Sequence, residues 1–550
     1  MKSSICKFLA VLFFIGWLYS SGISISAEIN QDYKVYVMAP LSKVNDWNDF
    51  SKQLITLKEN GVYGLTTDIW WGDVEANGDN QFDWSYYKQY AQIVRESGLK
   101  WVPIISTHQC GGNVGDDCNV PIPNWIWNLA SEGHLTQKSE TGYVNKETIS
   151  PWAGDIIEEQ YDELYQSFAE NFSEYSDIIS KIYISAGAAG ELRYSSYVPS
   201  AGWEYPERGE FQAYSDTAIT EFRNSMKSKY QSLSTLNNAW GTNLTSWNEV
   251  HPPTDGDNFF TSRAAYESQY GEDFLTWYQT ILMKHLDLIG ELAHNNFDPS
   301  FNVPIGAKIA GIHWKMEDPN MPNSAEYSAG YYSYDAILDQ FKETNLELTF
   351  TALEMDDSNA NVYPHYSAPK SLVMLISKLA NEKGLIINGE NALAISSTDS
   401  EYSISRYNNI AQHLFNENFS AFTLLRINTI VNRDGSTTNE MVHFRDILLL
   451  NPIEVEFIVK NAPTNFGDTV YITGSRWEMG MWNHSDGEMI ELNWDNTNKD
   501  WRGKGYIAAD RYYEFKALIK DTEGNIREWE SGENNKWVTP IGNSDYTLYW

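Results

Sequence analysis

The chain alternates short apolar runs with longer amphipathic segments between residues 33 and 430. The eight runs, rich in Val, Ile, Leu, Phe and Tyr, are Tyr33–Met38, Val62–Ile69, Leu99–Ser106, Ile178–Ser185, Val303–Ile309, Leu346–Leu353, Leu385–Ile387 and Phe419–Leu425. Helical periodicity is clearest between them over Asp46–Asn60, Trp84–Ser97, Gly154–Phe172 and Asp273–His294. Continuously apolar strands joined by helices are typical of a parallel sheet covered by helices. Eight such units predict an α/β fold, a (β/α)8 TIM barrel, with its active site at the carboxyl ends of the strands.

After Asn451 the pattern changes to short strand-like segments separated by turn residues. The segments are Val455–Val459, Thr469–Thr473, Trp501–Ile507 and Tyr512–Ile519. They predict a C-terminal antiparallel β-sandwich domain. We therefore expect a barrel over residues 28–451 and a sandwich over residues 452–550, which pack directly because no flexible linker separates them.

The first residues have the pattern of a secretory signal peptide. Lys2 and Lys7 precede the apolar stretch Phe8–Trp17, and small or polar residues follow as far as Ala27. We expect residues 1–27 to be removed, with cleavage near Ala27, and the protein to be secreted. The apolar stretch is too short to span a bilayer, and no later run reaches roughly 18 apolar residues, so we expect no membrane partner.

The net charge of −35 argues against a nucleic-acid partner, because binding to phosphates needs a basic surface. A neutral polymer suits such a chain better, and the 21 Trp and 34 Tyr residues offer ring faces on which sugars stack. Cys6 leaves with the signal peptide, so the mature chain keeps Cys110 and Cys118. In an oxidising compartment these two predict a disulfide, and two free thiols are the alternative.

Two glutamates lie close after strand-like runs that are far apart in the sequence. Glu191 follows Lys181–Ser185, and Glu390 follows Leu385–Ile387. Cleavage of a glycosidic bond needs two such carboxyl groups, one to protonate the leaving oxygen and one to activate water or attack the sugar carbon. A lone glutamate is usually a solvated surface group, so the pair counts only with the predicted barrel around it.

Other polar residues lie near or just after the carboxyl ends of most of the predicted strands, as the barrel rule requires of an active site. They are Asp68, His108, Gln109, Arg193, Lys308, His313, Thr351, Glu354, Asn391 and Arg426. Each could be a cap or a solvated loop group by itself. Their recurrence at seven of the eight predicted strand ends favours a binding site.

Several of these segments resemble one family of glycoside hydrolases. They are TTDIWWGDVE at 66–75, HQCGGNVGD at 108–116, AGELRY at 189–194, GIHW at 311–314, FTALEM at 350–355 and ENAL at 390–393. Together they resemble glycoside hydrolase family 14, the β-amylases, which are exo-acting α-1,4-glucan maltohydrolases. The C-terminal segment resembles a family 20 starch-binding module through Met481-Trp482-Asn483, Glu514-Phe515-Lys516 and Glu528-Trp529-Glu530-Ser531.

The resemblance implies Glu191 as general acid and Glu390 as general base of an inverting hydrolysis that releases β-maltose. Inversion requires the carboxyl groups to lie roughly 6.5–9.5 Å apart, with a water molecule between the base and the sugar. Residues matched to family positions that contact substrate are Asp68, His108, Asp116, Lys308, His313, Thr351, Asn391, Ala392 and Arg426. Asp116 belongs to a glycine-rich segment that matches the family's mobile lid, and starch, amylose and maltooligosaccharides are the implied partners of a monomer.

The resemblance also implies a structural calcium site and a sugar platform. The calcium ligands would be Glu75, Asp79, Gln160 and Glu163, hard oxygen donors of the kind that Ca²⁺ prefers. Relatives often carry a carboxylate where this chain has Gln160, which leaves an acidic surface patch as the alternative. In the C-terminal module, the platform would comprise Trp482, Lys516, Trp529, Glu530 and Asn534.

Three other functions stay open at this point. A retaining barrel glycosidase could use the same two glutamates as acid/base and nucleophile, although such enzymes usually carry Asn where this chain has Gly190. A retaining α-amylase would expect an aspartate nucleophile after the fourth strand. A starch adhesin without activity would need only the C-terminal module, and would not need Glu191 and Glu390.

Overall fold

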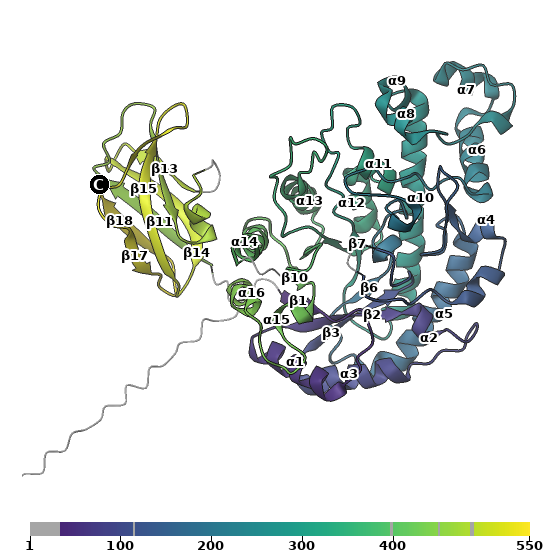
Figure 1. Ribbon diagram of the computed structural model, residues 1–550, viewed down its shortest axis with the longest axis horizontal. Coiled ribbons are helices and arrows are strands. Elements are labelled where there is room, and N and C mark those ends of the chain that lie inside the picture. The colour runs from purple at the N-terminus through teal and green to yellow at the C-terminus, as the bar shows by residue number, and fades with distance from the viewer. Residues whose placement is uncertain (1–33, 114–115, 396–399, 449–451, 485–488) are drawn as a thin grey trace, which may run out of the picture.

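The computed structural model describes residues 34–113, 116–395, 400–448, 452–484 and 489–550. The predicted signal peptide lies outside them. Figure 1 shows a barrel surrounded by helices and a separate C-terminal sheet domain.

Eight parallel strands close into a barrel in the order β1-β10-β9-β8-β7-β6-β3-β2. Their bounds are β1 (Lys34–Met38), β2 (Gly64–Trp70), β3 (Lys100–Ser106), β6 (Ile182–Ile184), β7 (Ile305–Ile309), β8 (Glu347–Phe350), β9 (Ile387–Glu390) and β10 (Ala421–Leu424). The last strand pairs with the first, Lys34 opposite Ala421, which closes the barrel. The predicted fold class is therefore confirmed.

The predicted bounds of β9 are wrong. The strand was expected over Leu385–Ile387, but it begins at Ile387 and continues through Asn388, Gly389 and Glu390. Asn388 can be buried inside the barrel because its side chain accepts a hydrogen bond from Lys181 and donates one to Glu347. A strand predicted from apolar residues alone ends too early where buried polar groups satisfy each other.

Helices cover the outside of the barrel. Their bounds are α1 (Trp47–Glu59), α2 (Trp71–Val74), α3 (Ser85–Ser97), α4 (Glu132–Leu135), α5 (Gly154–Phe172), α6 (Asp216–Tyr230), α7 (Leu233–Trp240), α8 (Gly256–Thr261), α9 (Arg263–Tyr266), α10 (Gln269–Phe297), α11 (Ser324–Ala329), α12 (Tyr334–Glu343), α13 (Pro369–Lys383), α14 (Ser400–Asn416), α15 (Ile427–Ile430) and α16 (Glu440–Leu448). In α5 the residues Tyr161, Leu164 and Phe168 recur at helical spacing and are buried. Side chains of this kind hold the helices on the sheet.

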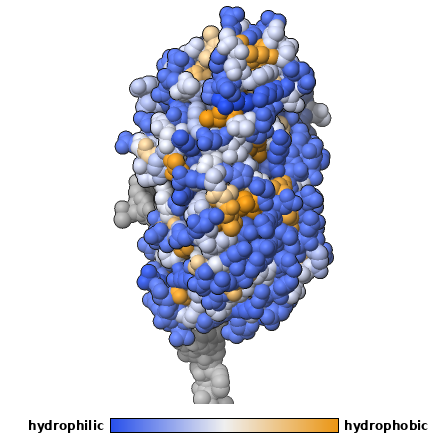
Figure 2. All heavy atoms as spheres, turned by 90° about the vertical axis from the view of Figure 1, so that its right-hand side faces the viewer, coloured by the Kyte–Doolittle hydropathy of each residue, from blue (hydrophilic) through white to orange (hydrophobic). Residues whose placement is uncertain are grey.

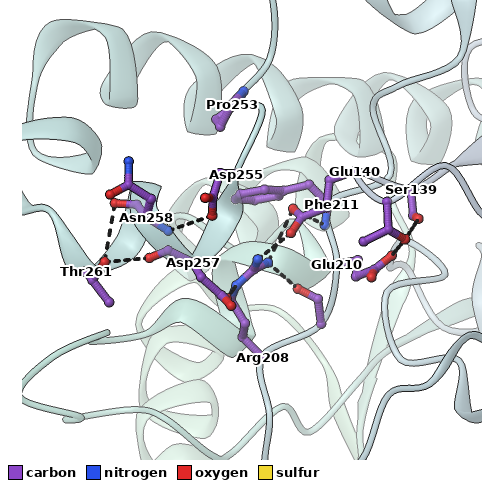
Figure 3. Close-up of polar contacts among 12 residues, drawn as sticks. Ser139, Glu140, Arg208, Glu210, Phe211, Pro253, Asp255, Asp257, Asn258 and Thr261 are labelled. Atoms are coloured by element: carbon purple, nitrogen blue, oxygen red, sulfur yellow. Dashed lines mark hydrogen bonds and ion pairs between the residues drawn. The ribbon is translucent and has the colours of Figure 1, made fainter.

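A long segment after β6 forms part of the wall above the barrel and is anchored by Arg208. This guanidinium lies between the carboxylates of Glu140 and Asp257, as Figure 3 shows. The Nε atom donates to Asp257 at 2.6 Å, and the Glu140 carboxylate also accepts the backbone N–H of Phe211. A small sheet of β4 (Gln137–Lys138) and β5 (Val144–Asn145) lies in the same outer region of the chain. Arg208 therefore links segments whose aromatic side chains Phe211 and Phe260 are buried in the core.

The C-terminal domain consists of strands packed around a second core. The strands are β11 (Pro452–Lys460), β12 (Thr469–Gly474), β13 (Ile490–Asp495), β14 (Asp500–Ala508), β15 (Tyr512–Lys520), β16 (Ile526–Trp529), β17 (Asn535–Val538) and β18 (Ser544–Tyr549). Val455, Phe457, Ile472 and Phe515 belong to its buried core. The pairing is antiparallel except between β11 and β18, where the last strand adds in parallel to the free edge of the first.

The surface seen in Figure 2 is mainly hydrophilic, with only small, separate hydrophobic patches. That composition agrees with the strong negative charge of the chain. Within the described part of the chain, no helix combines the length and the apolar character needed to cross a bilayer.

Candidate active site

A cavity of about 580 Å³ opens at the carboxyl ends of the barrel strands. Every residue predicted to act in catalysis or to bind substrate in the barrel lines it: Asp68, His108, Asp116, Glu191, Lys308, His313, Thr351, Glu390, Asn391, Ala392 and Arg426. This volume is in the range of small-molecule sites. The barrel therefore brings these residues into one cavity, as the strand-end rule predicts, and their individual roles stay predictions.

Glu191 is presented by a tight turn after β6. Ala189 and Gly190 both have positive φ angles, of 54° and 80°, and a Cβ on Gly190 would lie 3.0 Å from the ring of His108. Only glycine fits this approach without displacing the histidine. The turn places the Glu191 carboxylate beside Arg193, whose Nε donates to it at 2.9 Å.

Burial raises the pKa of Glu191 above its ordinary value, although the charge of Arg193 acts in the opposite direction. Desolvation disfavours the charged form of a carboxyl group more strongly here than the cation favours it. A carboxyl group in this environment holds its proton to higher pH than a surface glutamate, which is what a general acid requires.

Glu390 has a different environment at the end of β9. Both of its carboxylate oxygens accept hydrogen bonds from Lys308 Nζ, at 2.6 and 2.9 Å. Burial opposes the charge of Lys308, but the Glu390 carboxylate raises the pKa of this lysine above its ordinary value. Lys308 therefore keeps its positive charge against both oxygens of Glu390, an arrangement that suits a carboxylate acting as general base.

Serine hydroxyls contact three of the predicted substrate-binding side chains, and the hydroxyl of a fourth predicted residue contacts the main chain. Ser106 donates to Asp68 at 2.9 Å, Ser185 lies 2.8 Å from His108 Nδ1, and Ser367 lies 2.7 Å from His313 Nδ1. Thr351 Oγ1 accepts the backbone N–H of Gly311 at 3.0 Å. The sequence interpretation missed these serines because a serine carries no signal of which distant side chain it orients.

Burial lowers the pKa of both histidines in the cavity, that of His313 to about 4. Both imidazoles are therefore neutral near pH 7, so each ring offers one donor and one acceptor. Because a serine hydroxyl contacts Nδ1 of each ring, Nε2 is left to pair with a sugar hydroxyl, as donor or acceptor according to the tautomer.

Three further residues form hydrogen bonds between the loops that follow β1, β8, β9 and β10 at the cavity wall. Asn391 Oδ1 accepts the backbone N–H of Leu425 at 2.9 Å, and Arg426 Nη1 donates to the Ala39 carbonyl at 3.3 Å. Glu354, noted at the end of the sixth predicted strand but given no role, is also part of the wall. Its carboxylate accepts the backbone N–H groups of Ala392 and Leu393 at 3.0 and 2.9 Å.

The glycine-rich segment carries Asp116 to the cavity. Asp116 Oδ2 accepts the backbone N–H groups of Gly111 and Asn113, at 3.1 and 3.0 Å. Cys110 and Cys118 form the predicted disulfide across this segment. Residues 114 and 115 lie outside the described residues, and the predicted lid function stays a prediction.

The four predicted calcium ligands offer a partial site away from the cavity. The Glu75 carboxylate is buried, and burial raises its pKa to about 7, with Asp79 and Glu163 adding negative charge nearby. Gln160 Oε1 and Glu163 Oε2 are buried and have no hydrogen-bond partner. Both Glu75 oxygens, however, already accept bonds, from Trp71 Nε1 and Asn80 N. Among the residues described, no three His, Cys, Asp or Glu side chains are grouped closely enough to hold a metal alone.

The predicted sugar platform of the C-terminal domain is partly exposed. Trp482 ends the short 3-10 helix η6 (Trp477–Trp482), and Trp529 ends β16. His484 lies two residues after Trp482, and its ring centroid is 5.0 Å from that of Trp529. The two indoles therefore belong to the same region of the surface.

The polar residues of this platform are mostly occupied with the domain itself. Lys516 Nζ donates to the carbonyls of Glu530 and Gly532, and Asn534 donates to Glu514. Glu530 is buried, and its carboxylate accepts the N–H of Ala517 and the amide of Asn535. Glu530 thus supports the loop beneath the platform in the structure, while Lys516 and Asn534 remain partly exposed.

Known proteins with similar sequences cover nearly the whole chain. A thermophilic β-amylase of Thermoanaerobacterium thermosulfurigenes is 52% identical over 538 residues, 96% of this chain and 95% of that protein. A β-amylase of Bacillus cereus is 48% identical over 546 residues, 98% of this chain and 97% of that protein. The crystal structure of the catalytic domain of a Paenibacillus polymyxa β-amylase superposes with a TM-score of 0.73 at 54% identity, covering 77% of this chain and 99% of that one.

Two family matches divide the chain in the same way as the two cores. Residues 36–451 match glycosyl hydrolase family 14, and residues 452–548 match the starch binding domain family. The first match spans the barrel with its cavity, and the second spans the C-terminal strands. The chain therefore belongs to glycosyl hydrolase family 14 and is a glycoside hydrolase that carries a starch-binding domain after its catalytic barrel.

Proposed function

We propose that the protein is a secreted, monomeric β-amylase, a 1,4-α-D-glucan maltohydrolase that releases β-maltose from the non-reducing ends of starch chains by inversion. The observation that carries this proposal is the contrast between the two glutamates of the cavity. Burial raises the pKa of Glu191, whereas Lys308 Nζ contacts both oxygens of Glu390. Two carboxyl groups with such different environments can divide acid and base catalysis between them.

In the proposed reaction, Glu191 gives its proton to the glycosidic oxygen as the bond to the anomeric carbon breaks. Glu390 removes a proton from a water molecule, and the water oxygen attacks that carbon from the opposite face. Asp68, His108 and His313 offer donors and acceptors, held by serine hydroxyls, for the hydroxyl groups of the glucose rings. Side chains fixed in this way lose little freedom when substrate binds.

The anomeric form of the fresh product tests this mechanism. Proton NMR during the first minutes of maltopentaose hydrolysis should show β-maltose before mutarotation, because a single displacement inverts the configuration. α-Maltose as the first product would show retention and favour the double-displacement alternative. A ladder of mixed oligosaccharides from amylose would exclude exo-action.

Secretion and starch adsorption complete the proposal. The Cys110–Cys118 disulfide suits an oxidising compartment, in agreement with the signal-like residues 1–27. The starch-binding domain supports starch as the physical substrate. We propose that Trp482 and Trp529 stack on glucose rings there, with Lys516 and Asn534 at the edge of the platform.

We also propose a structural calcium ion at Glu75, Asp79, Gln160 and Glu163. The two unpartnered oxygens, Gln160 Oε1 and Glu163 Oε2, support it, since a buried oxygen atom without a donor can be satisfied by a hard cation. The ion would neutralise local acidic charge and hold α5 against the loop that follows α2. It would take no part in bond cleavage.

A further inference from the structure

The short segment that follows β9 is held from both neighbouring strands. On the β8 side, Glu354 Oε2 accepts the N–H of Ala392 at 3.0 Å and Oε1 accepts the N–H of Leu393 at 2.9 Å. On the β10 side, the segment's own Asn391 donates from Nδ2 to the Leu425 carbonyl and accepts the Leu425 N–H at Oδ1. Asn391 Nδ2 also donates to the Leu393 carbonyl within the segment. Glu390 immediately precedes this segment, so the same bonds limit the movement of its backbone.

Glu354 is itself fixed by the helix behind it. Its carbonyl accepts Arg406 Nη1 at 3.2 Å and Asn409 Nδ2 at 3.0 Å, both from α14, and the residue is only 3% exposed. Two residues earlier, Ala352 has a φ angle of +86°. A non-glycine residue keeps such a strained conformation only where surrounding contacts enforce it, and this occurs most often at functional sites.

The chemistry of this contact requires a carboxylate. Burial raises the pKa of Glu354, but the two backbone N–H groups and Arg406 act in the opposite direction. A glutamine has the same shape but only one acceptor oxygen. Its NH₂ group would face one of the two N–H donors and leave that buried donor without an acceptor.

The segment also shapes the cavity directly. Leu393 lines the cavity and is 46% exposed, which is unusual for a leucine beside a buried catalytic group. Its side chain offers an apolar surface to a sugar ring, and its placement depends on the N–H groups that Glu354 holds.

We propose that Glu354 is a positioning residue of this glycoside hydrolase: its two carboxylate oxygens set the Ala392–Leu393 backbone and thereby the placement of Glu390 and Leu393 in the cavity. The inference rests on the proposed β-amylase function, in which Glu390 is the general base. In the proposed reaction, Glu354 contacts no reacting atom. It acts through the main chain of its neighbours.

The test measures maltose release from maltopentaose by the full-length Glu354→Gln variant and by the unsubstituted full-length protein. We expect kcat to fall about 10- to 100-fold with a much smaller change in KM, as loss of a charged acceptor predicts. Glu354→Asp keeps both acceptors on a shorter side chain, so we expect it to restore part of the lost kcat. A purely structural contribution would instead lower the unfolding temperature and the folded fraction, without a rescue that depends on the charge.

Glu326→Gln is the matched control. Glu326 is a second buried carboxyl group, 5% exposed, that accepts a bond from Tyr334 and does not line the cavity. Burial raises its pKa to about 8, so it is already neutral near pH 7. We expect this variant to keep the kcat of the unsubstituted protein.

The outcomes separate the two proposals. If the unsubstituted protein releases no maltose, the proposed function fails. If it releases maltose and Glu354→Gln has the same kcat, the positioning inference alone is overturned, as it is if Glu326→Gln loses as much activity. Should Glu354→Gln not fold, amide hydrogen exchange on the unsubstituted protein decides: slow exchange at Ala392 and Leu393 supports the inference, and exchange as fast as in open loops overturns it.

Discussion

The barrel cavity and the platform of the C-terminal domain are formed by different kinds of side chain. The cavity holds two buried carboxyl groups, each in contact with a cation: Glu191 with Arg193, and Glu390 with Lys308. The platform presents two partly exposed indoles, Trp482 and Trp529, on the surface of a sheet domain. Bond cleavage needs charges removed from water, where they interact strongly, whereas adsorption needs ring faces that a polymer can reach from solution.

This difference has an energetic consequence. Taking a carboxylate out of water costs several kcal/mol, and only a well-placed counterion and hydrogen bonds offset it. The barrel tolerates that cost at Glu390, where Lys308 Nζ contacts both carboxylate oxygens. At Glu191 burial outweighs the charge of Arg193 and raises the pKa, which favours the neutral acid form. The platform carries no such cost, so its substitutions should alter adsorption without disturbing the fold.

The largest effect should come from removing the proposed general base. Glu390→Gln keeps the shape but cannot accept a proton, and it leaves Lys308 without its buried partner. We expect kcat for maltopentaose to fall by about 10²–10⁴-fold or more, while adsorption to starch granules stays unchanged. Activity within tenfold of the unsubstituted protein would show that the cavity uses another base, and a parallel loss of adsorption would contradict the separation of the two regions.

Much of the fold could be predicted because the barrel's apolar runs report burial directly. The alternation of strand and helix predicted the closed barrel, and α5 has the predicted bounds. The prediction failed where polar residues are buried, as at Asn388 in β9, whose side chain is satisfied by Lys181. In the C-terminal domain, β13, β16, β17 and β18 were missed because their faces are mostly exposed and polar residues interrupt their apolar ones, so none forms a continuous apolar run.

The site was predictable in part for a similar reason. Side chains such as Asp68 and Lys308 lie near the ends of apolar runs, so the strand-end rule finds them. Ser367 and Glu354 act on groups brought close only by the closed barrel, His313 and Leu393 respectively, and sequence spacing does not show those pairs. Glu530 was expected at the sugar platform, but its carboxylate is occupied beneath it, which no local pattern indicates.

A second prediction concerns the pH dependence that the cavity imposes. Arg193 lowers the pKa of Glu191, in opposition to burial, so removing its charge in Arg193→Met should raise that pKa further. The acid form of Glu191 would then persist to higher pH, and the alkaline limb of kcat/KM should move to higher pH. The acidic limb serves as the internal reference and should stay in place. A downward shift of the alkaline limb would contradict the assignment of Glu191 as the acid.

The platform provides the converse experiment. Trp529→Ala should weaken adsorption to starch granules about tenfold, as loss of one stacking ring predicts, and leave kcat for soluble maltopentaose unchanged. Tyr549→Ala removes another aromatic ring of the same domain, 67% exposed, and should keep adsorption intact. Equal losses of adsorption and hydrolysis in Trp529→Ala would mean that the two regions are not independent.

The smallest effect should come from calcium, and it should be confined to the barrel. Saturating Ca²⁺ stabilises a folded domain by a few kcal/mol at most, so a chelator should lower the unfolding temperature of the barrel by about 2–5 °C. The proposed ligands Gln160 and Glu163 lie on α5, which packs extensively on α10 and has no part in the C-terminal core. Calorimetry of the full chain should therefore show the barrel transition move while that of the starch-binding domain stays in place. Glu163→Gln should abolish the chelator's effect, because it removes a ligand charge from a group with an unpartnered oxygen. A chelator effect that persists in this variant, or that moves the other transition, would place the ion elsewhere.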